Sequence, residues 1–325
     1  MPNRRDFIRQ SALSLGALAL SKNLFAVAAK ANSYASPFAI KFAPRLTMDM
    51  FRSSSGKGLA ERARYFYENG FRAVEGAVFF NHTKQSDAQI AEQSALADVV
   101  KELGMEMGCI SSMNEKDFPI MTANCVPNKS VGDKKAVEDF LLWQMEGTFE
   151  IMRRIGGKTF IIGAGTKTKD IPDEKQYENV VANMRFCAEH CLKNGFTMEI
   201  EPLNEKMHRG VYVTHAALGA KICKDVNMPS CRLLYDVYHE HMQTGSNAAL
   251  DDAEIFKHIL SFHLADAPQR KEPGTGEIDF ETILKKIWQK GFRGIIGLEH
   301  GQTDNSKEGD KKLWEIYRKL DACAS

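Results

Sequence analysis

The chain has 325 residues, of which 43% are hydrophobic and 26% are charged, and its formal net charge is +1. This composition is that of an ordinary globular protein and excludes a disordered or fibrous chain. No basic block stands out, so we expect no nucleic-acid partner.

Residues 1–31 have the character of an export signal rather than of a folded domain. Arg4 and Arg5 precede an apolar stretch of small residues over 11–20, and Ala-x-Ala sites follow it. This order resembles a twin-arginine signal, and the apolar stretch is too short to span a bilayer comfortably. We therefore predict a cleaved signal over 1–31 and a mature periplasmic domain over 32–325 that has no membrane segment.

Eight short apolar runs in the mature chain are predicted to be buried β-strands, with amphipathic helices between them. The runs are 40–43, 73–78, 106–111, 159–163, 197–201, 232–236, 261–265 and 294–299. Before five of these runs a Gly follows the helical stretch, as in Asn194-Gly195-Phe196. A left-handed residue is expected at such a helix end. A final helix is expected over about 307–320.

This alternation of strands and helices predicts an α/β protein with a parallel sheet and helices outside it. Eight units in roughly 290 residues fit a single (β/α)₈ TIM barrel with an extra C-terminal helix. A doubly wound open sheet is the alternative, but no Gly-x-Gly-x-x-Gly turn follows the first run. The seven cysteines are odd in number and form no Cys-x-x-Cys pair, so we predict no disulfide scaffold.

Four ionisable side chains stand at the ends of the last four runs: Glu201, Asp236, His263 and Glu299. Singly, each could cap a turn, pair with a lysine or fill the core. Together they would share the rim of a barrel where active sites lie. Three carboxylates and one imidazole there predict a site for one divalent metal ion, Mn²⁺ or Mg²⁺ first, with Co²⁺ or Zn²⁺ as substitutes.

Several segments carry a family resemblance. They are Asn-Gly-Phe-Arg-Ala-Val-Glu (69–75), Ile-Glu-Pro-Leu-Asn (200–204), Tyr-Asp-Val-Tyr-His (235–239), Ala-Asp-Ala-Pro-Gln-Arg-Lys-Glu-Pro-Gly-Thr-Gly-Glu-Ile-Asp (265–279) and Gly-Phe-Arg-Gly-Ile-Ile-Gly-Leu-Glu (291–299). They resemble hydroxypyruvate isomerases, which belong to the xylose-isomerase-like barrels together with ketose 3-epimerases. One residue departs from the isomerase pattern, because His263 stands where those isomerases usually have Gln and the epimerases have His.

The resemblance implies that Glu201, Asp236, His263 and Glu299 hold the metal. It also implies that Glu201 and Glu299 remove and return a proton beside a substrate carbonyl, through an enediolate that the metal stabilises. We therefore expect a metal-dependent isomerase that acts on a small sugar or keto acid.

Three further side chains are candidates for the neighbourhood of this site. His239 matches a family position that contacts a substrate oxygen, and the guanidinium of Arg270 is suited to a carboxylate or hydroxyl of the substrate. A solvated loop position is the alternative for Arg270. Glu199 should point the same way as Glu201, into the barrel, and would need a partner such as a lysine.

Other functions stay open. A ketose 3-epimerase is favoured by His263, whereas the Pro-Gly-Thr-Gly-Glu segment (273–277) favours the isomerase. A lyase of a 3-keto-sugar would use the same proton abstraction. A periplasmic sugar-binding barrel without turnover is the non-enzymatic alternative, and the two intact carboxylates argue against it. Association into a homo-oligomer is left open.

Overall fold

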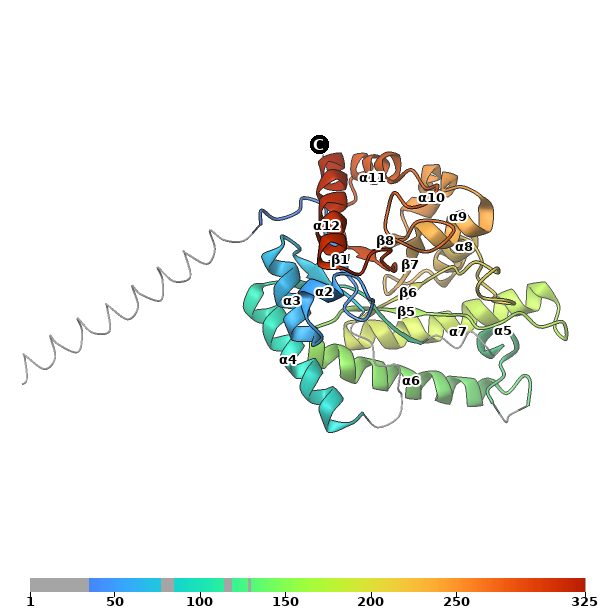
Figure 1. The fold of residues 1–325 in the computed structure, drawn as a ribbon. Coiled ribbons are helices and arrows are strands. Elements are labelled where there is room, and N and C mark those ends of the chain that lie inside the picture. The colour runs from blue at the N-terminus through green and yellow to red at the C-terminus, as the bar shows by residue number, and fades with distance from the viewer. Residues whose placement is uncertain (1–34, 77–84, 114–118, 128–129, 325) are drawn as a thin grey trace, which may run out of the picture.

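The computed structural model describes residues 35–76, 85–113, 119–127 and 130–324 (Figure 1). The predicted signal, 1–31, lies outside the described residues, so its boundary stays a prediction. Among the described helices, none combines the length and the apolar character that a bilayer crossing requires.

All strand pairs of the sheets are parallel. The strands are β1 (Phe42–Pro44), β2 (Ala73–Val74), β3 (Glu106–Met107), β4 (Ile110–Met113), β5 (Thr159–Ile162), β6 (Thr197–Ile200), β7 (Cys231–Asp236), β8 (Ile259–Leu264) and β9 (Ile296–Leu298). One sheet of seven strands has the order β1-β9-β8-β7-β6-β5-β4, and β2 pairs with β3 in a second, two-stranded sheet.

The two-stranded sheet lies between the two edges of the larger sheet. An isolated parallel bridge joins Arg45, just after β1, to Glu75, just after β2. On the other side, the chain passes from β3 to β4 through only Gly108 and Cys109, and the Gly76 N–H donates to the Cys109 carbonyl at 3.2 Å. β3 and β4 thus form the third barrel strand in two pieces, where the sequence predicts one continuous run. The fold is the predicted (β/α)₈ TIM barrel.

Helices surround the strands (Figure 1). They are α2 (Arg52–Ser55), α3 (Leu59–Glu68), α4 (Asp87–Leu103), α5 (Ile120–Ala123), α6 (Lys134–Ile155), α7 (Asp173–Asn194), α8 (Ala216–Val226), α9 (Val237–Thr244), α10 (Ala253–Phe256), α11 (Phe280–Gln289) and α12 (Lys307–Asp321), with the 3₁₀ turns η1 (Ala248–Asp251) and η2 (Ala322–Ala324). Three helices end as predicted, because Gly104 after α4, Gly156 after α6 and Gly195 after α7 are left-handed, with φ of 62°, 76° and 74°.

The longer helices form because one face of each is apolar and is buried. In α11 the buried side chains are Phe280, Ile283, Leu284 and Ile287, which is the spacing of one helix face. Asp279 begins this helix, because its carboxylate accepts the Thr282 N–H at 3.1 Å.

The end of the chain closes the barrel against its beginning. α12 follows β9, the last barrel strand, and lies beside β1 and α2 (Figure 1). The Asp321 carboxylate accepts the backbone N–H groups of Ala39 and Ile40, at 3.0 and 2.8 Å. Tyr317 of α12 is fully buried and its ring contacts that of Phe42 in β1. These contacts fix the two ends of the domain to each other.

Candidate metal centre

The four predicted ligands lie at the carboxyl ends of four neighbouring strands. Glu201 follows β6, Asp236 ends β7, His263 is the last residue but one of β8, and Glu299 follows β9. Asp236 and His263 are register partners in the parallel pair β7–β8. Since the strands are parallel, all four side chains emerge at the same rim.

Their polar atoms converge. His263 Nδ1 lies 2.7 Å from Glu299 Oε2, 3.3 Å from Glu201 Oε1 and 4.0 Å from Asp236 Oδ2. One ligand atom from each of the four residues lies within 4.8 Å of each of the others. These same four atoms are buried, and none of them makes a well-formed hydrogen bond to a residue that the structure describes.

Buried polar atoms without hydrogen bonds are costly, and three carboxylates around one point also repel each other. A divalent cation would pair with all four atoms at once, and a set of three carboxylates and one imidazole suits Mn²⁺ or Mg²⁺ and also Co²⁺ or Zn²⁺. The residues present therefore fit a metal ion.

The two carboxylate oxygens of Asp236 have different roles, one in the fold and one at the rim. Oδ1 accepts the N–H groups of Tyr238 and His239, at 2.8 and 3.0 Å, and so caps the N-terminus of α9. Oδ2 is left to face the rim. Burial raises the pKa of Asp236 above its ordinary value, although the charges of Arg270 and His263 oppose this rise.

Two arginines hold Glu299 from opposite sides. Arg45 Nη1 lies 2.9 Å from Oε1 of Glu299, and Arg270 Nη2 lies 3.2 Å from Oε2 and 3.7 Å from Asp236 Oδ2. Burial acts to raise the pKa of Glu299, but Arg45, Arg270 and His263 outweigh it and hold this pKa well below the usual range. Sequence reasoning missed Arg45, although it directly follows the first strand, in the same position at the rim as the predicted ligands.

His239 presents a single N–H at the rim. Its Nδ1 accepts the backbone N–H of Asn204 at 3.1 Å, so the ring proton is on Nε2. Nε2 is buried, has no hydrogen-bond partner among the described residues, and lies 3.9 Å from Asp236 Oδ2. Burial and then the charge of Arg270 lower the pKa of His239 to about 3. The imidazole is therefore neutral and is a donor toward the site.

The loop that carries Arg270 is organised by Asp266, which sequence reasoning did not single out. Its buried carboxylate accepts four backbone N–H groups, from Ala267, Gly274, Gly276 and Ile278. Arg270 itself has a left-handed backbone, with φ of 56°, and its guanidinium lies over the ring of Tyr238. The loop thus aims the guanidinium at the rim.

Glu199 points into the barrel as predicted, but its observed partner is not a lysine. The hydroxyl of Ser261 donates to its Oε2. Burial raises the pKa of Glu199 to about 7. The side chain lines a cavity of about 420 Å³ with Cys109 and Ser261, and it is not among the four converging residues of the rim.

The chain has relatives among known proteins. The family model for the xylose isomerase-like TIM barrel matches residues 63–319. A putative hydroxypyruvate isomerase of Drosophila melanogaster is 26% identical over 275 residues, which are 83% of this chain and 96% of that protein. The hydroxypyruvate isomerase of Escherichia coli is 28% identical over 168 residues, which are 51% of this chain and 64% of that one.

Solved structures have the same fold. One is an AP endonuclease of family 2 from Brucella melitensis, with a TM-score of 0.67, 21% identity and coverage of 86% of this chain and 99% of that one. Another is a 3-keto-D-glucoside 4-epimerase from Escherichia coli, with a TM-score of 0.65, 16% identity and coverage of 87% and 100%. With most of its length matched by the family model, the chain belongs to the xylose isomerase-like TIM barrel family.

Proposed function

We propose that the protein is a divalent-metal-dependent isomerase of a small hydroxy-carbonyl compound, a sugar or a keto acid. One observation carries this proposal: four buried ligand atoms without hydrogen bonds converge at the rim of the barrel. The similarity to hydroxypyruvate isomerases supports the reaction class.

Glu201, Asp236, His263 and Glu299 would hold the ion. When bound, a divalent cation acts as a Lewis acid that polarises the substrate carbonyl and stabilises the negative charge formed by loss of the neighbouring proton. Mn²⁺ or Mg²⁺ is proposed first, with Co²⁺ or Zn²⁺ as substitutes.

Proton transfer and substrate binding are assigned to different side chains at the rim. Glu201 and Glu299 are proposed to take the proton from the carbon beside the carbonyl and to return it. The Nε2–H of His239 would donate to a substrate oxygen, since it has no other acceptor among the described residues. Arg270 would hold an anionic or hydroxyl group of the substrate through its planar set of donors.

A 3-epimerase is the second candidate, and the position of His263 between two carboxylates is the observation that favours it. Glu299 and Glu201 lie 2.7 and 3.3 Å from the same ring nitrogen, and epimerisation needs proton removal and return on opposite faces of one carbon. The similarity to a 3-dehydro-D-guloside 4-epimerase of Escherichia coli, 21% identical over 259 residues, supports epimerisation as a reaction class but not the 3-position.

The test is solvent deuterium exchange. Protein loaded with Mn²⁺ or Mg²⁺ is incubated in D₂O with hydroxypyruvate, ketoses and 3-keto-sugars, and substrate and product are followed by NMR. We expect metal-dependent product formation, with deuterium beside the carbonyl wherever the abstracted proton exchanges with solvent. A product in which the carbonyl has moved to the neighbouring carbon identifies an isomerase. A product in which one stereocentre is inverted identifies an epimerase.

Variants of the two carboxylates test the assignment of the bases. Glu201→Gln and Glu299→Gln should each abolish turnover, and near-normal activity in either would contradict the mechanism. Product formation by metal-free protein would contradict the metal dependence. If no compound reacts but the protein binds sugars, the non-enzymatic binding barrel gains support.

We also propose that the protein is exported by the twin-arginine route to the periplasm. Arg4, Arg5 and the apolar stretch that follows them motivate this proposal. A folded reporter fused to residues 1–31 should be exported, and replacement of both arginines by lysine should retain it in the cytoplasm. Export that does not depend on the two arginines would refute the route.

A further inference from the structure

Glu75 occupies a place in the barrel that the proposed function does not use. It directly follows β2, at the end of a strand, as Glu201 and Glu299 do. Its side chain is fully buried, with 0% exposure. A carboxylate in such a place is costly unless a specific partner compensates its charge.

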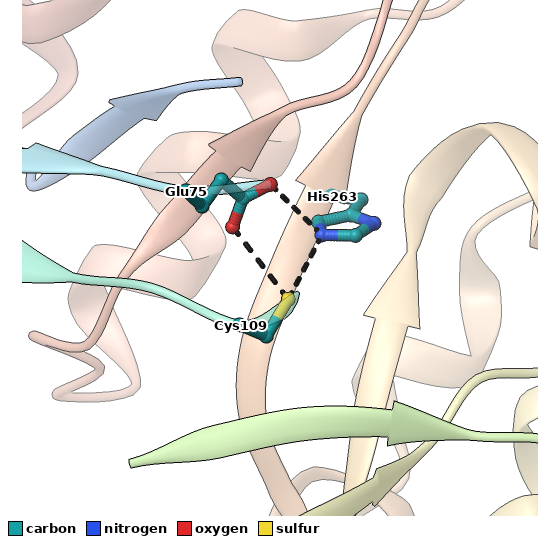
Figure 2. Close-up of side chains that lie close together, drawn as sticks. All are labelled: Glu75, Cys109 and His263. Atoms are coloured by element: carbon teal, nitrogen blue, oxygen red, sulfur yellow. Dashed lines mark hydrogen bonds and ion pairs between the residues drawn. The ribbon is translucent and has the colours of Figure 1, made fainter. Parts of the chain in front are cut away.

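Glu75 contacts the His263 ring at Nε2, the nitrogen that faces away from Glu201 and Glu299 (Figure 2). Glu75 Oε1 lies 3.0 Å from His263 Nε2, and Glu75 Oε2 accepts from Cys109 Sγ at 3.7 Å. Cys109 Sγ also lies 3.4 Å from Nε2. The other ring nitrogen, Nδ1, faces Glu201 and Glu299. The imidazole of His263 therefore stands between an inner carboxylate and the carboxylates of the rim.

Two glycines make the room for this inner carboxylate. A Cβ added at Gly297 would lie 2.1 Å from Glu75 Oε1, and one added at Gly108 would lie 2.8 Å from Glu75 Cβ. Gly297 is also the register partner of His263 in the pair β8–β9. A side chain at either glycine would occupy the space of the Glu75 side chain, so the barrel interior is shaped around this contact.

We propose that Glu75 is a positioning residue that holds a proton on His263 Nε2 and thereby directs Nδ1 toward the ion held at the rim. This inference rests on the proposed function, because it assumes a cation at the rim. A carboxylate at 3.0 Å attracts an N–H and repels a ring lone pair, so Nε2 keeps its proton. With a cation held among Glu299, Glu201 and the ring, Nδ1 would be the nitrogen left to supply a lone pair. Such a partner also makes the ligating nitrogen more basic.

The same three side chains offer a competing arrangement. Glu75, Cys109 and His263 are all groups that bind metals, and they lie close enough to share an ion of their own. That arrangement would require Nε2 to lose its proton, whereas the positioning role requires Nε2 to keep it. Substitution of Cys109 distinguishes the two arrangements, because a second metal site needs the Cys109 sulfur and the positioning role does not.

The first experiment compares Mn²⁺ binding by metal-free wild type, Glu75→Gln and the matched control Cys109→Ser. Free Mn²⁺ is followed by electron paramagnetic resonance, and bound ions per chain are counted by elemental analysis. We expect Glu75→Gln to bind Mn²⁺ roughly 10–100-fold more weakly. Cys109→Ser should keep the wild-type affinity and one ion per chain.

The outcomes separate this inference from the proposed function. If the wild type binds Mn²⁺ and Glu75→Gln binds it equally well, the positioning role is refuted while the metal centre stands. If the wild type binds two ions and Cys109→Ser binds one, the cluster is itself a metal site and the inference fails. If the wild type binds no Mn²⁺, both proposals fail.

A second measurement needs no variant of Glu75. Imidazole ¹⁵N spectra of the Mg²⁺-loaded wild type report which ring nitrogen carries the proton, and the signals of His263 are identified by their absence in His263→Gln. We expect the proton of His263 on Nε2 and none on Nδ1. The opposite tautomer would overturn the inference even if Glu75→Gln did not fold.

Discussion

Asp266 should control the order of the loop that carries Arg270. Asp266 is buried, with 1% exposure. Oδ1 accepts the N–H groups of Ala267 and Ile278 at 2.9 and 3.1 Å, and Oδ2 accepts those of Gly274 and Gly276, both at 2.8 Å. In Asp266→Asn, one of these oxygens becomes an NH₂ group. Two of the four backbone N–H groups then face a donor instead of an acceptor.

The size of the effect follows from the number of lost bonds. A hydrogen bond to a charged group contributes about 1.5–3 kcal/mol, so two of them contribute about 3–6 kcal/mol to the order of the loop. Because each 1.4 kcal/mol is tenfold, the closed loop should become roughly 10²–10⁴-fold less favoured relative to its open forms. The loop can open without unfolding the barrel, so the global free energy of unfolding should fall by less than this amount.

The assay is amide hydrogen exchange by mass spectrometry, read on peptides that cover residues 266–279. Exchange should accelerate there in Asp266→Asn, and the Michaelis constant should rise because Arg270 is no longer aimed at the rim. The matched control is Asp279→Asn, which makes the same change of charge at the far end of the loop. Asn caps a helix about as well as Asp, so exchange over 266–279 should stay near that of the wild type. Equal exchange in the two variants would refute the reasoning.

Two further substitutions test buried contacts, one inside the barrel and one between the barrel and α12. Gly297→Ala places a methyl group 2.1 Å from Glu75 Oε1, and should destabilise the protein by about 1–3 kcal/mol in urea unfolding and also weaken Mn²⁺ binding. Gly157→Ala, where the nearest atoms would be at 3.6 Å, is the control, and equal Mn²⁺ affinities in the two variants would contradict the prediction. Tyr317→Phe removes the hydroxyl that lies 2.5 Å from His300 Nε2, and leaving that buried nitrogen unpaired should lower the free energy of unfolding by about 1–3 kcal/mol. An unchanged urea midpoint would show that the contact contributes nothing.

The strands and the rim were predictable because both follow from local sequence. A buried parallel strand is a short apolar run, and a charged residue at its end is visible in the run itself. Glu201, Asp236, His263 and Glu299 were identified in this way, and the structure brings their polar atoms together. Their roles as ligands and bases stay predictions.

The groups that surround these four residues were not predictable in the same way. Arg45 and Glu75 also stand directly after strands, but each is separated from its partner at the rim by more than half of the chain. A sequence shows that such residues are ionisable, whereas it does not show which distant charge they will meet. The break between β3 and β4 was missed for a related reason, since it occurs where Gly108 lies against Glu75, a contact between two strands.

The side chains at the rim share one mode of orientation. A residue with two polar atoms engages one of them with the fold and presents the other to the site. The engaged atom and its partner are Asp236 Oδ1 with the N-terminus of α9, Glu299 Oε1 with Arg45, His263 Nε2 with Glu75, and His239 Nδ1 with Asn204.

This arrangement fixes each side chain before any ligand arrives, so binding need not freeze these rotamers again. It also predicts that substitutions at the rim and substitutions of its partners should have different effects. A substitution that removes the presented atom removes a metal ligand or a hydrogen-bond donor. A substitution that removes the partner of the engaged atom leaves the rim residue in place, but its side chain can then rotate. Glu201 differs from these four residues, since no described residue forms a hydrogen bond with its carboxylate. A carboxylate with that freedom is suited to a group that must take up a proton and return it, which is the role proposed for Glu201.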